Sequence, residues 1–208
     1  HRYHNSDAAP GVTEMNEIIS ELKPAAMMFL AFSLLTGLIY PLAITGIVQT
    51  TMPERAGGSL ILVEGNVIGS ELICQNFTSS GYFHGRPSAA GYAADASAAS
   101  NLGPTSARLM DEVRHRVEGV RRENNLSQDD PVPADLALAS ASGLDPHISM
   151  QGAMLQVPRI ARSRGIAESE VKLLVYQTIE PAQFGILGQE RVNVLKLNLA
   201  LDKLTEER

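Results

Sequence analysis

The chain of 208 residues is long enough for one domain of ordinary size plus an appendage, and it carries 17 Lys and Arg against 23 Asp and Glu. The formal net charge of −6 and the absence of a dense cationic cluster argue against a nucleic-acid-binding protein. The single cysteine, Cys74, can form neither an internal disulfide nor a thiolate metal cluster.

The first predicted element is a membrane-spanning helix over residues 25–48. No charged residue occurs between Pro24 and Pro53. A helix over residues 25–48 would measure about 36 Å, which crosses a hydrocarbon core of about 30 Å with some tilt. The apolar run is longer than that of a signal peptide and no small-residue cleavage site follows it, so we predict an uncleaved single span. The alternative is a buried hairpin of two short core helices broken at Pro41.

One stripe of the predicted span combines small residues with hydroxyl-bearing ones. On a helical wheel it holds Ala26, Ser33, Thr36, Gly37 and Tyr40. Helices associate in membranes where small residues permit close approach and hydroxyls find hydrogen-bond partners. We therefore predict that this stripe packs against other membrane helices. The nearly balanced Lys and Arg residues on the two sides of the span leave its orientation undecided.

Residues 49–208 are predicted to form an α+β domain. Apolar runs at 59–63 and 67–68 flank the turn residues Gly65 and Asn66, which indicates a β-hairpin. Residues 81–104 are rich in Gly, Ala, Ser and Pro, which is typical of a long loop. Hydrophobic spacing and capping residues then predict helices over 105–124, 134–141, 149–165 and 167–178. The near alternation of apolar residues over 192–201 predicts a final strand that returns to the sheet.

Two stretches of the domain have the composition of an active site. YFHGRPS (82–88) and SGLDPHIS (142–149) hold two of the five histidines beside Ser, Asp and Arg. However, Ser142, Asp145 and His147 are too close in sequence for a catalytic triad, and no Gly-x-Ser-x-Gly elbow occurs. The histidine spacing matches no metal-binding motif, and no phosphate-binding loop is present, so no cofactor is assigned to the chain.

Structural roles explain the two stretches better. Asp145 before Pro146 indicates a turn in which the carboxylate binds an N–H group two residues on, and Arg86 before Pro87 indicates an extended segment held by its guanidinium. The predicted partner-contact or loop-structuring residues are Tyr82, Phe83, His84, Arg86, Asp145 and His147. The alternative is a single-span membrane-anchored hydrolase or metal-dependent enzyme that uses His84 and His147.

Seven sequence blocks occur in order along the chain: GSLI, VIGSELICQNF, YFHGRPSAAGY, SNLGPTS, SASGLDPHIS, QVPRIARSRGI and RVNVLKLNLALDKL. Together with the apolar span, they closely resemble the C subunit of bacterial Kdp-type potassium-transporting ATPases. The resemblance covers nearly all of residues 24–204. Cys74 stands where glycine is more usual in that pattern.

The resemblance implies an accessory, assembly-stabilising subunit of an ATP-driven, high-affinity potassium uptake pump, non-catalytic by itself. Its implied partners are a potassium-channel-like subunit, a P-type ATPase subunit, a small accessory subunit and membrane lipid, with no nucleic acid. ATP, Mg²⁺ and K⁺ would be used by the complex, and a role in assisting ATP binding has also been proposed for the family. The implied topology, in the bacterial inner membrane, is a cytoplasmic tail (1–24), a span (25–48) and a soluble extracytoplasmic α+β domain (49–208).

Overall fold

The computed structural model describes residues 10–206, with side chains from residue 20 onward. The chain divides into two compact units, of which one ends at Gly57 and the other begins at Gly58, and each is described by itself. The first nine residues of the predicted tail lie outside the described residues. Residues 10–24, also predicted as tail, form the beginning of the first helix.

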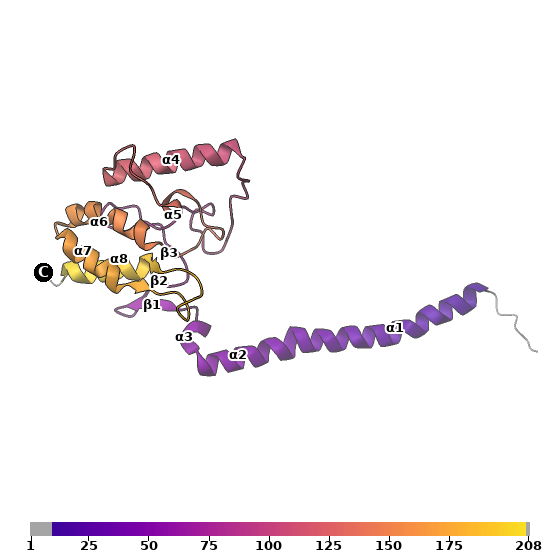
Figure 1. Ribbon diagram of the computed structural model, residues 1–208. Helices are drawn as coiled ribbons and strands as arrows, with labels where there is room; N and C mark the ends of the chain where they lie inside the picture. The colour runs from indigo at the N-terminus through magenta and orange to yellow at the C-terminus, as the bar shows by residue number, and fades with distance from the viewer. Residues whose placement is uncertain (1–9, 207–208) are drawn as a thin grey trace, which may run out of the picture. The chain divides into compact units, whose positions relative to one another are not determined.

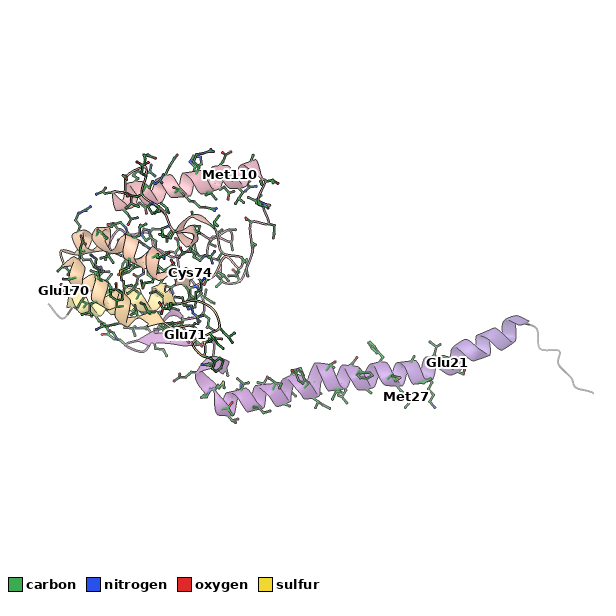
Figure 2. The ribbon with its side chains drawn as sticks, in the orientation of Figure 1. Glu21, Met27, Glu71, Cys74, Met110 and Glu170 are labelled. Carbon is green, nitrogen blue, oxygen red and sulfur yellow. The ribbon has the colours of Figure 1, made fainter. Side chains whose placement is uncertain are left out.

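The first unit is almost entirely helical (Figure 1). It consists of α1 (Pro10–Leu34), the π-helical segment η1 (Leu35–Ile39), α2 (Tyr40–Thr51) and the short α3 (Pro53–Ala56). Residues 20–51 form one continuous helical stretch that is long and apolar enough to cross a membrane. Its side chains project on all sides and none is buried (Figure 2). The alternative of a buried hairpin broken at Pro41 is therefore wrong.

The π-helical segment accommodates Pro41. Proline has no N–H group and its ring clashes with the carbonyl four residues earlier in a regular helix. Here the N–H of Tyr40 donates to the carbonyl of Leu35, five residues earlier, which widens the turn just before the proline. Because a π turn holds one extra residue, the residues after it are rotated by about 100° relative to a regular α-helix. The packing role of Ala26, Ser33, Thr36, Gly37 and Tyr40 stays a prediction.

The second unit begins with the predicted hairpin, which is confirmed. Strand β1 (Leu60–Val63) pairs antiparallel with β2 (Asn66–Ser70), with a bulge between Ile61 and Leu62. The turn is formed by Glu64 and Gly65, one residue earlier than predicted, and both have positive φ (51° and 79°). Two successive positive φ angles are the requirement of the tight hairpin turn whose twist matches that of the strands.

The predicted helices are confirmed, with shifted ends. They are α4 (Ala107–Asn124), α5 (Ala134–Ala137), α6 (Met150–Arg164) and α7 (Glu168–Gln177). The Oγ atoms of Ser106 and Ser149 accept the N–H groups of Leu109 and Gly152, which caps α4 and α6 as the sequence indicated. Gly165 ends α6 in the left-handed conformation.

The final strand predicted over residues 192–201 is wrong in most of its length. Only β5 (Arg191–Asn193) is a strand, and α8 (Val194–Glu206) follows at once. Val194, Leu197 and Leu201 recur at helical spacing and are all buried, so the helical period decides the structure. β5 lies at the centre of a small antiparallel sheet of order β3-β5-β4, whose other strands are β3 (His147–Ile148) and β4 (Ile179–Glu180).

The core lies among α6, α7, α8 and this sheet. Its buried side chains include Ile148, Val157, Ile160, Val171, Val175, Val192, Leu197 and Leu201. Residues 71–106, which join β2 to α4, contain no helix or strand, as predicted for the loop over 81–104. Phe83, from this connection, lies in the core and is fully buried, and Phe77 packs against the core from the same segment. The first histidine-containing stretch is therefore attached to the core by its own aromatic residue.

Candidate partner-contact site

Two side-chain amides hold the backbone of the first stretch. The Oδ1 atom of Asn198, on α8, accepts the N–H of Phe83 (2.8 Å), and its Nδ2 donates to the Phe83 carbonyl (3.0 Å). Gln156, on α6, makes the same pair of bonds with the N–H (2.8 Å) and carbonyl (3.1 Å) of His84. Both amides are buried. They replace the neighbouring strands that would otherwise satisfy an extended backbone.

Tyr82 is held at the edge of the core. Its hydroxyl donates to Oδ2 of Asp202 (3.1 Å), and the guanidinium of Arg164 lies over its ring, 4.6 Å from the centroid. Arg164 also donates to the carbonyl of Gly81 and forms an ion pair with Asp202 (2.7 Å). Tyr82 is half-buried and remains available for contact, whereas Phe83 is buried and can only structure the loop.

His84 occupies a fixed position in its loop. Its Nε2 lies 3.0 Å from the carbonyl of Ser79, which can only accept, so Nε2 carries the proton. Its Nδ1 lies 3.5 Å from a carboxylate oxygen of Glu123 on α4. Burial lowers the pKa of His84 below its usual value, with Arg159 acting in the same direction and the contacts with Ser79 and Glu123 opposing it. Burial therefore favours the neutral ring, whose Nε2–H holds the side chain to its own loop at Ser79.

Arg86 and Asp145 join the two stretches. Nη1 of Arg86 donates to Oδ2 of Asp145 (3.0 Å), and the other carboxylate oxygen accepts the N–H of His147 (3.1 Å). The turn at Asp145 is the one predicted from the sequence. The guanidinium of Arg86 holds its segment as expected, with Asp145 as the partner that the sequence did not identify. Burial by itself raises the pKa of Asp145, but the hydrogen bonds from His147 and Arg86 outweigh it and the pKa lies below its usual value. Asp145 is thus an ionised structural residue.

His147 lies between two carboxylates. Its Nδ1 is 3.5 Å from Asp145, and its Nε2 is 3.3 Å from Glu180 on β4. Glu180 also contacts Arg191 (3.2 Å) and Lys196 (3.4 Å). Burial tends to raise the pKa of Glu180, but these cations and His147 lower it overall. The carboxylates around His147 therefore already have cationic partners within the protein.

The two histidines do not share a site. His84 lines two adjoining hollows of about 330 and 400 Å³, together with Thr78 and Glu123. His147 lines a different hollow of about 470 Å³, with Arg86 and Asp145, and no lining residue is common to the two regions. Within the described residues, no group of three His, Cys, Asp or Glu side chains is arranged to hold a metal ion. The alternative of an enzyme that uses His84 and His147 together is not supported.

Sequence reasoning missed a buried arginine of the region, Arg159 on α6. It is 6% exposed and donates to Oδ1 of Asn124 (3.0 Å), to the carbonyl of Ser80 and to Oε1 of Gln156 (2.8 Å). These bonds connect α4, the loop and α6. A signal was present, because Gln156 and Arg159 are adjacent to the apolar residues Val157 and Ile160, on the core-facing side of α6.

Cys74 packs beneath the same loop, against Gly85. Its side chain is buried, and the residue is labelled in Figure 2. Burial, with the nearby Asp145 carboxylate, raises the pKa of the thiol to about 11. The sulfur lies where a side chain at Gly85 would have to be, since a Cβ atom there would come within 2.6 Å of it. Cys74 and Gly85 therefore complement each other in size.

Comparisons with known proteins agree on one family. The family described as KdpC, the c chain of K⁺-transporting ATPases, matches residues 22–203. The potassium-transporting ATPase KdpC subunit of Rhodospirillum rubrum is 52% identical over 188 residues, which cover 89% of this chain and 97% of the relative. The corresponding subunits of Cereibacter sphaeroides (51% over 185 residues; 89% and 98%) and Polaromonas naphthalenivorans (51% over 186 residues; 88% and 94%) are similarly close.

Proposed function

Since the chain belongs to the KdpC family, the c chains of K⁺-transporting ATPases, we propose that it stabilises the assembled pump and catalyses no reaction by itself. The observation that carries the proposal is the use of the polar residues in the two stretches. His84, Arg86, Asp145 and His147 all bind other parts of the same domain. Such residues shape a surface rather than transfer protons. Nucleotide, Mg²⁺ and K⁺ would then be handled by the other subunits.

The proposed partners are the subunits of the same pump: a potassium-channel-like subunit, a P-type ATPase subunit and a small accessory subunit. The exposed apolar stretch over residues 20–51 supports membrane attachment, because such a helix is stable only in lipid or against other membrane helices. Tyr82 and Arg86 are the proposed contact residues of the soluble domain. Both are half-buried, and tyrosine and arginine are among the residue types that most often supply interface energy.

Alanine substitutions in the purified pump test this assignment. Arg86→Ala should lower the amount of complex recovered with the tagged chain, because it removes the ion pair between the two stretches. His84→Ala and His147→Ala should leave the potassium-dependent ATPase activity of the assembled complex largely unchanged. A complex that assembles normally but loses turnover with either histidine variant, particularly if chelators reproduce the loss, would establish an active site instead.

The proposed orientation places the soluble domain outside the cytoplasm. A cysteine added after Arg208 should react with a membrane-impermeant maleimide in intact spheroplasts. Cys74 gives little background, because at pH 8 a thiol with a pKa of about 11 is ionised in roughly one molecule in a thousand and is also buried. The same labelling in a Cys74→Ser background measures any signal that does not come from the added cysteine. If the added cysteine were labelled only after lysis, the soluble domain would lie on the cytoplasmic side and the proposed orientation would be wrong.

The stripe on the membrane helix makes a separate prediction about assembly. A Cβ atom at Gly37 would meet no other atom within 4 Å in this chain, so a larger side chain there is tolerated by the helix itself. Gly37→Leu should nevertheless reduce co-purification of the large subunits, because it blocks close helix approach. The neighbouring Leu38→Ala is the control and should have little effect. Equal recovery with both variants would argue against a packing role for the stripe.

A further inference from the structure

The exposed apolar side chains of the second unit are concentrated on two segments. Thirteen large hydrophobic residues are exposed between residues 58 and 206, and nine of them lie on the β1–β2 hairpin (60–72) or on the turn between β4 and β5 (181–190). These nine are Leu60, Leu62, Val63, Val67, Ile68, Leu72, Phe184, Ile186 and Leu187. The other four lie singly or in a pair on other elements. A concentration of this kind indicates an interaction surface.

The two segments are joined at their bases. Nζ of Lys196 forms ion pairs with Glu71, which follows β2, and with Glu180, which ends β4 (2.6 and 3.4 Å). Nδ2 of Asn193 also donates to the carbonyl of Glu71 (2.8 Å). Glu71 is labelled in Figure 2. The hairpin and the turn therefore extend from one place on the domain, and together they are called the apolar tips.

The side chains of the apolar tips are exposed on more than one face. Leu62 is paired with Val67, so these two share a face of the hairpin, while the adjacent Val63 points to the opposite face. All three are exposed. In the turn, Phe184 is 91% exposed and Ile186 is 82% exposed, at a point where Phe184 and Gly185 both have positive φ. An apolar medium that surrounds these segments covers them more completely than a single flat protein face would.

The position of the hairpin in the chain keeps it close to a membrane. The helical stretch that can span the bilayer ends at Thr51, and β1 begins at Leu60. Nine residues of fully extended chain reach at most about 32 Å, so the hairpin cannot be farther than this from the end of the span. Residues 60–70 and 181–190 contain no Lys or Arg. Attraction to anionic lipid headgroups is therefore not a feature of this surface.

We propose that the apolar tips insert into the interfacial region of the lipid bilayer and hold the soluble domain against the membrane. The partner of this surface is then lipid. Both faces of the hairpin and the side chain of Phe184 enter it. The inference takes from the proposed function only the membrane span, and it holds for either orientation of the chain. Because no cation takes part, insertion depends on apolar burial and is the same in neutral and anionic membranes.

The chain contains no tryptophan, so a single introduced tryptophan reports on its own surroundings. The test uses the full chain in phosphatidylcholine vesicles, as the variants Leu62→Trp and Phe184→Trp. Met110→Trp is the matched control, since Met110 is exposed on α4 and belongs to neither segment. Lipids brominated on their acyl chains should remove most of the emission at positions 62 and 184 but not at 110, whereas aqueous acrylamide should quench in the opposite order. Added phosphatidylglycerol should leave the result unchanged.

Two outcomes would overturn the proposal. In one, all three tryptophans are quenched by acrylamide and none by brominated lipid. In the other, emission at 62 and 184 shifts to the blue only in the assembled pump and brominated lipid still has no effect, which would assign the surface to a partner subunit. Alkaline carbonate extraction of the same vesicles tests the membrane span separately. The chain is released from the vesicles if residues 20–51 do not span the bilayer, but it stays bound if only the apolar tips do not insert.

Discussion

Asn198→Ala should lower the free energy of unfolding by about 2–5 kcal/mol, since it removes the side-chain hydrogen-bond partner of two buried backbone groups of Phe83. The N–H and the carbonyl of Phe83 would both lose their hydrogen bonds inside a core where Asn198 is 1% exposed. Burying a polar group without a partner costs about 1–3 kcal/mol for each group. Denaturant unfolding of the full chain in detergent, followed by circular dichroism, measures the change.

The exposed Asn76→Ala is the matched control for this substitution, and its effect should stay within about 0.5 kcal/mol. If the two variants were equally stable, the loop would not depend on the amide of Asn198. The same result would also contradict the conclusion that α8 positions the first histidine-containing stretch.

Gly85→Ala should destabilise the domain by about 1–3 kcal/mol, because the new methyl group would lie within 2.6 Å of the Cys74 sulfur. Neither residue has free space to move into, since the sulfur is buried and the backbone of the adjacent His84 is held by Gln156. Unfolding of the full chain in denaturant gives the size of the effect. Gly103→Ala is the control, as a Cβ atom there meets nothing within 4 Å.

A second substitution tests whether contact with the Cys74 sulfur causes the loss of stability in Gly85→Ala. In a Cys74→Ala background the sulfur is absent, so Gly85→Ala should cost much less than it does alone. Additive costs in the double variant would show that the glycine is required for some reason other than the sulfur. The double variant thus separates a steric effect from a backbone effect at the same position.

The sequence predicted those elements of the fold that depend on local signals. The hairpin was visible because two apolar runs flank turn residues, and α4 and α6 were visible because Ser106 and Ser149 precede residues of helical periodicity. The strand predicted over 192–201 failed because its apolar residues satisfy both a period of two and a helical period. Tertiary packing, which buries Val194, Leu197 and Leu201 together, decides between them. Strands β3 and β4 have two residues each and carry no periodicity at all.

The candidate site was predictable to a similar degree. The turn at Asp145 follows from short-range residue chemistry and is present. Its ion pair with Arg86 joins residues 59 apart in the chain, and this pairing was not predicted. The amide bonds of Gln156 and Asn198 were not predicted, because their partners lie 72 and 115 residues away in the chain. A glutamine or an asparagine at a core-facing helix position indicates that some buried polar group is nearby. It does not indicate which one.

The distance of 115 residues between Phe83 and Asn198 also has a consequence for the order of events during synthesis. At about 5–20 residues per second, a ribosome needs roughly 6–23 s to add that length of chain. Throughout this interval the first histidine-containing stretch exists without α8, and Phe83 has no completed core to enter. Contacts between such distant residues also form slowly in a complete chain. During synthesis, residues 82–88 therefore remain without their α8 partner for many seconds.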